Sequence, residues 1–168
     1  MSSYIHETAE VSNLASVGSH TKIWNNAQIR ENARIGQNCI ISKDVYIDVG
    51  VSIGNSCKVQ NGVSIYAGVF IEDNVFIGPN ACFTNDLFPR ALNENWQIIE
   101  TYISRGASIG ANATIVCGNR IGEFSMVGAG SVVIKDVPDF ALVVGNPARV
   151  IGYVDEEGKR LTSKNKID

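Results

Sequence analysis

The chain has 168 residues and a net charge of −3, from 14 lysines and arginines against 17 aspartates and glutamates. This weakly acidic balance argues against a nucleic-acid partner, because binding to a phosphate backbone needs an excess of cationic side chains. The chain has no run of eighteen apolar residues and no basic segment followed by an apolar one at its start. We therefore expect a protein that is neither inserted into a membrane nor exported.

Apolar residues recur at every sixth position through most of the chain. The first series runs without a break: Ile5, Val11, Val17, Ile23, Ile29, Ile35, Ile41, Ile47, Ile53, Val59, Ile65, Ile71, Ile77 and Phe83. A second series follows an interruption: Ile103, Ile109, Ile115, Ile121, Val127 and Val133. A period of six fits neither a helical turn nor simple strand alternation, but it divides an eighteen-residue coil into three short strands. The pattern predicts an all-β solenoid whose coils stack into one core.

The four cysteines show neither metal-ligand nor disulfide spacing, so we expect no metal and a reducing, cytoplasmic setting. Cys39 and Cys57 lie eighteen residues apart, and we expect them to stack on neighbouring coils as small buried hydrophobes. Cys82 and Cys117 fall outside the inward positions. No histidine accompanies them as a base, which argues against a thiol nucleophile.

The repeat is interrupted once, between Phe83 and Ile103. Counting in eighteens makes Ile103 the successor of Ile71, so about fourteen of residues 84–102 must leave the coil as a loop. The loop holds hydrogen-bonding, cationic and aromatic side chains: Asn85, Asp86, Arg90, Asn93, Trp96 and Tyr102. Solenoid insertions of this size often serve binding. We expect a functional loop, and the alternative is a flap that packs onto a neighbouring subunit.

The solenoid is expected to form one domain, residues 1–136, which includes the loop. Pro138 lacks a backbone donor and is predicted to end the coil. Residues 137–168 then form a short C-terminal extension, with one or two strands around a turn at Gly145-Asn146-Pro147.

The repeat from Ile5 to Val133 resembles the hexapeptide-repeat family, whose fold is a left-handed parallel β-helix. The handedness comes from the resemblance, because periodicity alone cannot set it. The segments KDVP (135–138) and GNPAR (145–149), which follow GAGSVV (128–133), resemble the end of hexapeptide acyltransferases that use acetyl-CoA. The resemblance implies acetyl-CoA as cosubstrate and a homotrimer with sites between adjacent subunits.

Candidate cofactor residues follow from the same resemblance. Lys135 and Arg149 are expected to face the phosphates of CoA, which require cations. The alternatives are a solvated charge for Lys135 and a salt bridge for Arg149. Ala129 is small enough to let the pantetheine arm approach the backbone, and a backbone N–H near Gly106 is a candidate to stabilise the oxyanion.

Three further segments resemble N-acetyltransferases that act on nucleotide-linked 3-amino sugars: VQNGVSIY (59–66), FIGPNACFTND (76–86) with PRA (89–91), and GASIGANATIVCG (106–118). The FTND and PRA segments favour the branch that acetylates dTDP-3-amino-3,6-dideoxyhexoses. VIGYVDEEGKRL (150–161) is similar to the branch that acetylates UDP-linked 3-amino-glucuronic acid during synthesis of bacterial surface polysaccharides. We favour the dTDP branch and keep the UDP branch as the alternative.

The chain has two histidines, His6 and His20, both in the first coils. At about 4.8 Å per strand spacing, His20 lies roughly 17 Å along the axis from the loop, and a parallel neighbour in a trimer would present its histidine at the same height. Neither can then act as a general base. An amine substrate tolerates this absence, because a free amine needs only positioning against the thioester. In the mechanism favoured for the resembling enzymes, the proton leaves after attack, to the departing CoA sulfur.

Asn85 is the predicted catalytic residue. Its side-chain carbonyl can accept a hydrogen bond from the amine and orient the lone pair, and it matches the Asn of the FTN motif that the resemblance includes; the alternative is an Asn that caps the loop turn. Stacking in eighteens places Tyr66 beside Thr84, and hence beside the site. Asp86 is expected to hold a sugar hydroxyl and Arg90 a phosphate, unless the two form a local ion pair.

Three rival functions are considered. A zinc carbonic anhydrase of the same fold needs three histidine ligands at one height, which two distant histidines cannot supply. A sugar or serine O-acetyltransferase shares the fold and the cofactor but would need a histidine base. A noncatalytic solenoid scaffold would use the aromatic loop as an interface.

Overall fold

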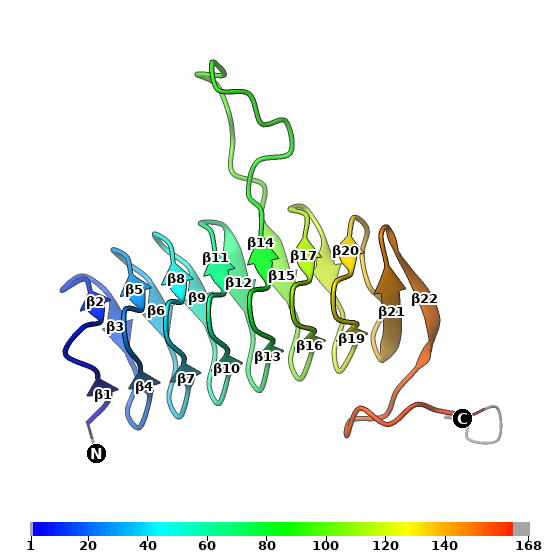
Figure 1. Ribbon diagram of the computed structural model, residues 1–168, viewed down its shortest axis with the longest axis horizontal. Helices are drawn as coiled ribbons and strands as arrows, with labels where there is room; N and C mark the ends of the chain where they lie inside the picture. Colours follow the sequence, from blue (N-terminus) through cyan, green and yellow to red (C-terminus); the bar gives the residue numbers. More distant parts are fainter. Residues whose placement is uncertain (1, 163–168) are drawn as a thin grey trace.

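The computed structural model describes residues 2–162, which form a solenoid of short strands (Figure 1). Three sheets, named A, B and C below, run along the solenoid, and each complete coil contributes one strand to each sheet. Within the described chain there is no helix long and apolar enough to span a membrane.

Sheet A contains β1 (Tyr4–Ile5), β4 (Lys22–Ile23), β7 (Ile40–Ile41), β10 (Lys58–Val59), β13 (Phe76–Ile77), β16 (Ser108–Ile109), β19 (Met126–Val127), β21 (Ala141–Gly145) and β22 (Ala148–Tyr153). Sheet B contains β2 (Glu10–Val11), β5 (Gln28–Ile29), β8 (Tyr46–Ile47), β11 (Ser64–Ile65), β14 (Cys82–Phe83), β17 (Thr114–Ile115) and β20 (Val132–Val133). Sheet C contains β3 (Ser16–Val17), β6 (Arg34–Ile35), β9 (Ser52–Ile53), β12 (Val69–Ile71), β15 (Thr101–Ile103) and β18 (Arg120–Ile121).

Stacked coils pair residues eighteen positions apart in parallel strands, as in Ile23 with Ile41. The apolar residue of each hexad points inward, so that Ile23, Ile41 and Val59 have no exposed surface. The first coil is the exception: Ile5 is 43% exposed, because no coil stacks beneath it. The predicted all-β solenoid is confirmed, and its architecture is consistent with the left-handed β-helix that the resemblance implies.

The corners between strands are tight turns. Many of them place one residue in the left-handed backbone region, which asparagine and glycine enter at the least cost. Asn26, Asn38 and Asn80 are examples, with φ of 55°, 58° and 58°. The polar residues that recur between the apolar ones are therefore turn residues.

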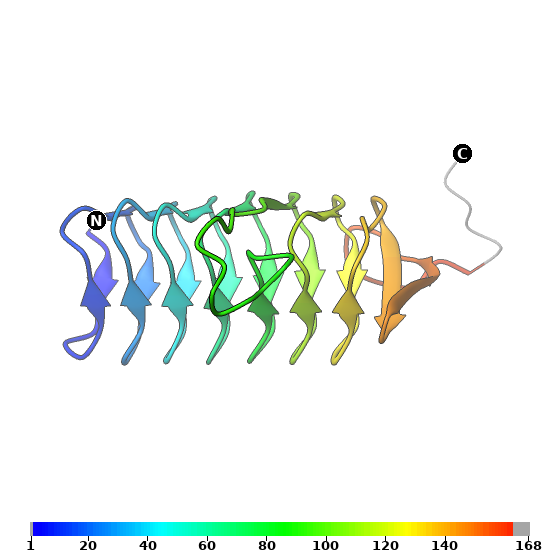
Figure 2. The same ribbon diagram turned by 90° about the horizontal axis from the view of Figure 1, so that it is seen from above.

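One corner between sheets B and C is replaced by the loop. Residues 84–100 leave the solenoid between β14 and β15 and project away from it (Figure 1), so that they overlie its middle coils when seen from above (Figure 2). Ile71 pairs with Ile103 across the interruption, which confirms the predicted register. The predicted loop, residues 84–102, is two residues too long, because Thr101 and Tyr102 already belong to β15.

The coil does not end at Pro138, contrary to the prediction. β21 pairs in parallel with β19, with Val143 opposite Val127, and so continues sheet A beyond the proline. At the equivalent corner one coil earlier, Gly122 donates its N–H to the next coil, at the carbonyl of Val137. No strand of sheet C stacks beyond Pro138 in the described chain, so its missing N–H removes no hydrogen bond there.

After β21 the chain turns at Asn146-Pro147, and β22 runs antiparallel to β21. This confirms the predicted strands around Gly145-Asn146-Pro147. Residues 163–168 of the predicted C-terminal extension lie outside the described residues. In the core, Cys39 and Cys57 are fully buried, as predicted.

Candidate active site

The loop is anchored at a short neck, which consists of Thr84 and Asn85 on the outgoing side and residues 98–101 on the return. The N–H of Ile99 donates to the carbonyl of Asn85 at 3.0 Å and closes the neck. This bond couples the backbone of the outgoing segment to that of the returning segment.

The coils on either side hold the neck in place. On the N-terminal side, the N–H of Thr101 donates to the carbonyl of Gly68 at 3.0 Å. On the C-terminal side, the N–H of Gly118 donates to the carbonyl of Glu100 at 3.1 Å. The base of the loop is therefore hydrogen-bonded into the solenoid, although its tip projects away.

Cys117 lies under this neck and is only 3% exposed, although it falls outside the inward positions of the repeat and outside the core cluster. Its N–H donates to Thr84 Oγ1 at 3.0 Å, and Ile99 lies close to the adjacent Gly118. The neck covers this corner, which a six-residue period cannot reveal. Cys82 is partly exposed on β14, and burial raises the pKa of its thiol, which disfavours the nucleophilic thiolate.

Asn85 presents an uncommitted side chain at the neck. Its backbone carbonyl is bonded to Ile99, but its carboxamide takes part in none of the hydrogen bonds found among residues 2–162. The alternative role of capping the loop turn is filled by Asp86, whose Oδ1 accepts from the N–H of Phe88 at 2.8 Å. A half-buried carboxamide on a fixed backbone can accept a hydrogen bond from a substrate amine.

Tyr66 lies one coil before the neck, where stacking predicts it. Ser64 pairs with Cys82, which places Tyr66 in register with Thr84. The side chain of Tyr66 is exposed, and its ring centroid lies 5.7 Å from that of Tyr46. The structure thus places Tyr66 one coil before the neck, with its ring against that of Tyr46.

Asp48 organises the corner that carries Tyr66. Its carboxylate accepts hydrogen bonds from the Tyr46 hydroxyl at 2.9 Å, from the Val49 N–H at 2.7 Å and from the Ala67 N–H at 3.2 Å. Burial, and then the hydrogen bond to Asp48, raises the pKa of Tyr46. Tyr46 therefore stays a neutral donor, and Asp48 links two coils directly below the neck.

The alternative to substrate binding by Asp86 and Arg90 was a local ion pair between them. No salt bridge in the described chain joins these two residues. Arg90 is exposed, and its guanidinium donates to the carbonyl of Pro89 at 2.7 Å. Its remaining donors face solvent. Both side chains keep polar atoms that can reach a ligand or a neighbouring molecule.

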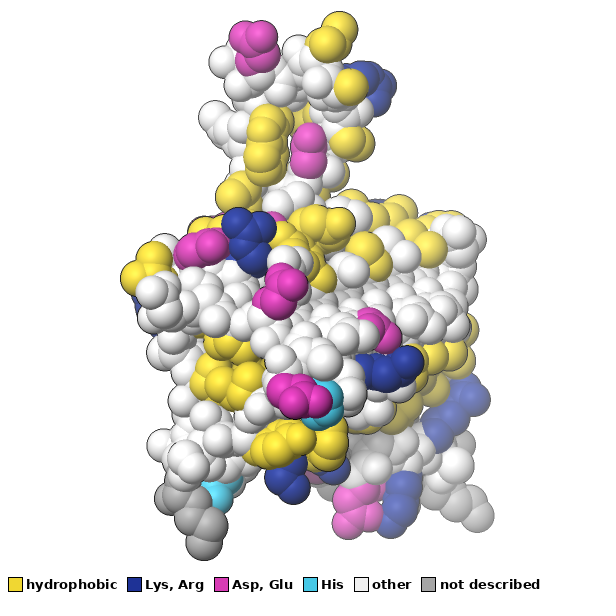
Figure 3. All heavy atoms as spheres, turned by 60° about the vertical axis from the view of Figure 1, so that its left-hand side comes forward, with side chains coloured by type: hydrophobic (Ala, Val, Ile, Leu, Met, Phe, Trp, Pro, Cys, Tyr) yellow, Lys and Arg dark blue, Asp and Glu magenta, His cyan; other side chains and the backbone are white. Residues whose placement is uncertain are grey.

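The outer part of the loop exposes large apolar side chains, which appear as yellow patches above the solenoid in Figure 3. Leu92 is 94% exposed and Phe88 is 74% exposed. Trp96 is also exposed and forms part of the wall of a hollow of about 190 Å³ within the loop. Gathered exposed apolar groups of this kind mark interaction sites, so the loop is suited to contact a ligand or a second subunit.

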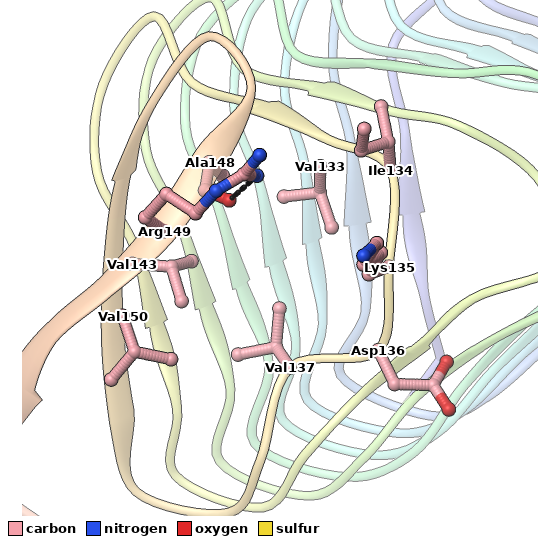
Figure 4. A pocket seen from close by; sticks show the side chains of 9 residues that line it. All are labelled: Val133, Ile134, Lys135, Asp136, Val137, Val143, Ala148, Arg149 and Val150. Carbon is pink, nitrogen blue, oxygen red and sulfur yellow. Dashed lines mark hydrogen bonds between the residues drawn. The ribbon is translucent and has the colours of Figure 1, made fainter.

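Lys135 and Arg149 meet at the C-terminal end of the solenoid. They lie on facing sides of a cavity of about 220 Å³ that is also lined by Asp136, Val137 and Val143 (Figure 4). The guanidinium of Arg149 donates to the carbonyl of the preceding residue at 2.9 Å. Neither cation forms a salt bridge with any described residue, so the alternative role for Arg149 is not found. Two unpaired cations at one cavity can bind an anion.

Lys135 also lies on the same edge of the solenoid as Asn85. Phe83 pairs with Ile115, and Ile115 pairs with Val133. Asn85 stands two positions after Phe83, and Lys135 stands two positions after Val133. The two residues are therefore two coils apart, about 10 Å along the axis at about 4.8 Å per strand spacing. A ligand that lies along this edge can contact both residues.

Gly106 and Ala129 lie at other corners, and one chain does not bring them to the neck. Gly106 is in the turn between β15 and β16, where its N–H donates to the carbonyl of Asp73 at 3.0 Å. That N–H is therefore not a free oxyanion donor, and the missing Cβ of Gly106 makes room for the ring of Phe124. Ala129 is exposed in the turn between β19 and β20.

Both histidines belong to the first coils. His6 follows β1, and its ring contacts Thr8 and Asn25 at 3.1 Å each. His20 occupies a corner between sheets C and A, whereas the loop leaves from a corner between sheets B and C several coils further on (Figure 1). No cluster of three His, Cys, Asp or Glu side chains suited to a metal ion occurs between residues 2 and 162.

Known proteins match the repeat. The family model described as the hexapeptide repeat of succinyl-transferase matches residues 32–67 and 103–135. Over 54 residues, 32% of this chain, the sequence is 67% identical to the dTDP-3-amino-3,6-dideoxy-alpha-D-galactopyranose 3-N-acetyltransferase of Aneurinibacillus thermoaerophilus. The chain spans 28% of the length of that relative.

Solved structures share the fold over most of the chain. The maltose O-acetyltransferase of Clostridium difficile 630 gives a TM-score of 0.64 at 27% identity, over 84% of this chain and 71% of the other. A variant of the GDP-perosamine N-acetyltransferase of Caulobacter crescentus, solved with CoA and GDP-perosamine, gives a TM-score of 0.59 at 22% identity, over 90% of this chain and 57% of the other. This second likeness shows the fold alone. The six-residue repeat and the three-sheet solenoid are thus shared with these proteins, and the chain is similar in sequence and fold to hexapeptide-repeat acyltransferases.

Proposed function

We propose that the protein transfers the acetyl group of acetyl-CoA to the 3-amino group of a nucleotide-linked amino sugar, with a dTDP-3-amino-3,6-dideoxyhexose as the favoured substrate. The observation that carries this proposal is the single edge of the solenoid on which Asn85 and Lys135 lie. The 67% identity to a relative named for a dTDP-linked 3-amino sugar supports the substrate class.

Acetyl-CoA would lie along this edge. Lys135 and Arg149, on facing sides of the C-terminal cavity, bind its phosphates through charge-assisted hydrogen bonds. The pantetheine arm then extends toward Asn85 and brings the thioester to the loop neck. Ala129 and Gly106 lie at other corners of the same chain, so they would contact the cofactor from the adjacent subunit of a homotrimer, without the N–H of Gly106 as an oxyanion donor.

The loop and the coil below it would hold the sugar nucleotide. Tyr66 offers an exposed ring beside the neck, Asp86 accepts from a sugar hydroxyl, and Arg90 binds a phosphate. The loop projects from its own solenoid (Figure 1). In the proposed homotrimer its outer residues would reach the neighbouring subunit, and this supports a site between subunits.

The reaction needs no protein base when the nucleophile is an amine. Asn85 Oδ1 accepts a hydrogen bond from the neutral amine and directs its lone pair at the thioester carbon. A C–N bond forms, the tetrahedral intermediate collapses, and the C–S bond breaks. The proton released from nitrogen goes to the departing CoA sulfur, so the products are the amide and free CoA thiol.

A screen of sugar nucleotides tests the proposal. The protein is incubated with acetyl-CoA and dTDP- or UDP-linked 3-amino and 4-amino sugars, and both thiol release and product mass are measured. We expect the fastest release with a dTDP-linked 3-amino sugar. Faster release with the UDP-linked 3-amino-uronate would favour the UDP branch. Acetylation of sugar hydroxyls would favour an O-acetyltransferase, and no release with any acceptor would favour a noncatalytic scaffold.

A further inference from the structure

We propose that Gly68 and Gly118 are positioning residues, which hold the backbone of Asn85 by receiving two consecutive isoleucines of the loop neck, Ile98 and Ile99. The catalytic consequence rests on the function proposed above. The contact itself does not depend on that function. The two glycines lie on the coils directly before and after the neck, at the same corner of the solenoid.

The contact on the N-terminal side is the tighter one. A Cβ added to Gly68 would overlap the Cγ2 methyl of Ile98. This methyl is attached directly to Cβ of a β-branched side chain, so it cannot move aside without a change of χ1 or of the backbone. The carbonyl of Gly68 also accepts the N–H of Thr101. A side chain at position 68 would therefore push against a segment that is already fixed by a backbone hydrogen bond.

The contact on the C-terminal side is closer to ordinary packing. A Cβ on Gly118 would lie 3.1 Å from the Cγ2 methyl of Ile99. Gly118 also donates its N–H to the carbonyl of Glu100. The two isoleucines thus reach in opposite directions along the solenoid axis and seat the returning segment between two coils.

This arrangement fixes Asn85, because the N–H of Ile99 donates to the Asn85 carbonyl at 3.0 Å. A shift of the returning segment would move or break this bond and displace the Asn85 side chain from the thioester. A misplacement of about 1 Å can lower turnover by on the order of 100-fold. Gly68 and Gly118 would then influence catalysis without touching either substrate.

Gly50 is a control that distinguishes contact with the loop from the general preference of this turn for glycine. It lies at the same corner of an earlier coil, with φ of +69°, against +91° at Gly68 and +84° at Gly118. All three positions are strained for an L side chain. However, a Cβ on Gly50 would meet nothing within 4 Å. Gly50→Ala therefore carries the backbone strain without the contact to the loop.

The experiment compares Gly68→Ala, Gly118→Ala and Gly50→Ala by kcat, by KM for acetyl-CoA and by hydrogen exchange at the Ile99 amide. We expect kcat to fall by roughly tenfold or more in Gly68→Ala, less in Gly118→Ala and within about twofold in Gly50→Ala, with KM for acetyl-CoA nearly unchanged. Exchange at Ile99 should accelerate in the same order. Adding Ile98→Ala to Gly68→Ala removes the overlapping methyl and should restore part of the lost kcat.

Two results would overturn the proposal: equal acceleration of Ile99 exchange in Gly50→Ala and Gly68→Ala, or no recovery in the double variant. Hydrogen exchange does not require activity, so it also separates the two hypotheses. Suppose that the wild-type protein acetylates no amine but that exchange at the Ile99 amide follows the expected order. The proposed function then fails, and the positioning of the neck by Gly68 and Gly118 is supported.

Discussion

Lys135 stands two coils beyond Asn85 on one edge of the solenoid, because Phe83, Ile115 and Val133 pair in a single row of sheet B. The cation lies at the end of the solenoid, beside the cavity that it shares with Arg149. The free carboxamide lies at the loop neck. In the proposed mechanism this spacing separates phosphate binding from acyl transfer, so variants can disturb the two independently.

The first prediction concerns the two cations. Lys135→Ala and Arg149→Ala should each raise KM for acetyl-CoA by about tenfold and leave kcat nearly unchanged. A tenfold change corresponds to the free energy of about one charge-assisted hydrogen bond to a phosphate. Steady-state kinetics check this. Acetyl-pantetheine, which lacks the phosphates, is the control and should react equally with wild type and variants. An equal loss with acetyl-pantetheine would show that these residues support the fold instead.

Removal of the Asn85 carboxamide should affect turnover and leave stability intact. The side chain takes part in none of the hydrogen bonds among residues 2–162, so Asn85→Ala should unfold at the wild-type denaturant midpoint. We expect its kcat to fall by on the order of 100-fold, because the amine loses its orientation.

A matched control for that variant is Lys43→Ala, at an exposed surface position of an earlier coil. It should match the wild-type protein in both midpoint and kcat. A kcat for Asn85→Ala within about twofold of wild type would remove Asn85 from the mechanism, since proximity effects of this kind are large.

The histidine variants test the absence of a protein base. His6→Ala and His20→Ala should each keep kcat within about twofold of wild type, because an amine nucleophile needs no residue to deprotonate it. The assay uses the favoured sugar nucleotide at saturating acetyl-CoA. If either variant loses most of its activity, the nucleophile needs a base, and a hydroxyl acceptor becomes the better hypothesis.

Asp48 should matter for stability and for sugar binding together. Its carboxylate accepts from Tyr46, Val49 and Ala67. Asp48→Ala should therefore lower the free energy of unfolding by about 2 kcal/mol, as for loss of a partly buried charged acceptor. It should also raise KM for the sugar nucleotide, since the Tyr66 corner loses its support. Urea unfolding and kinetics check the two effects, and a change in neither would show that the corner is held by the coil alone.

Much of this fold follows from the six-residue period. Burial at every sixth position specifies the inward face, the coil length and the place of the insertion, so the pairing of Ile71 with Ile103 could be predicted. Tyr66 and Lys135 could be placed in rows by the same counting. These relations depend on regular stacking, which a sequence pattern records directly.

The hydrogen bonds at the corners could not be predicted in this way. The period does not show that the N–H of Gly106 is already bonded to Asp73, or that the neck buries Cys117. Both depend on where a backbone group of another coil or of the loop lies. The prediction that Pro138 ends the coil was wrong for a related reason. The missing N–H of a proline matters only where a neighbouring strand would accept a hydrogen bond from it.

The last prediction concerns assembly. Leu92 is 94% exposed at the outer part of a loop that projects from its own solenoid (Figure 1), and in the proposed homotrimer it would contact a neighbouring subunit. Light scattering should give the mass of a trimer for the wild-type protein. Leu92→Glu should shift the population toward smaller species and lower kcat, since the proposed site lies between subunits.

Leu14→Glu provides the matched control for Leu92→Glu. Leu14 is 62% exposed on the first coil, far along the solenoid from the loop, so the same charge placed there should leave both mass and kcat unchanged. Full activity in a monomeric Leu92→Glu variant would show that one chain carries the whole site. In that case Lys135 and Asn85 of the same edge would have to bind acetyl-CoA without a neighbour, and Gly106 and Ala129 would have no part in it.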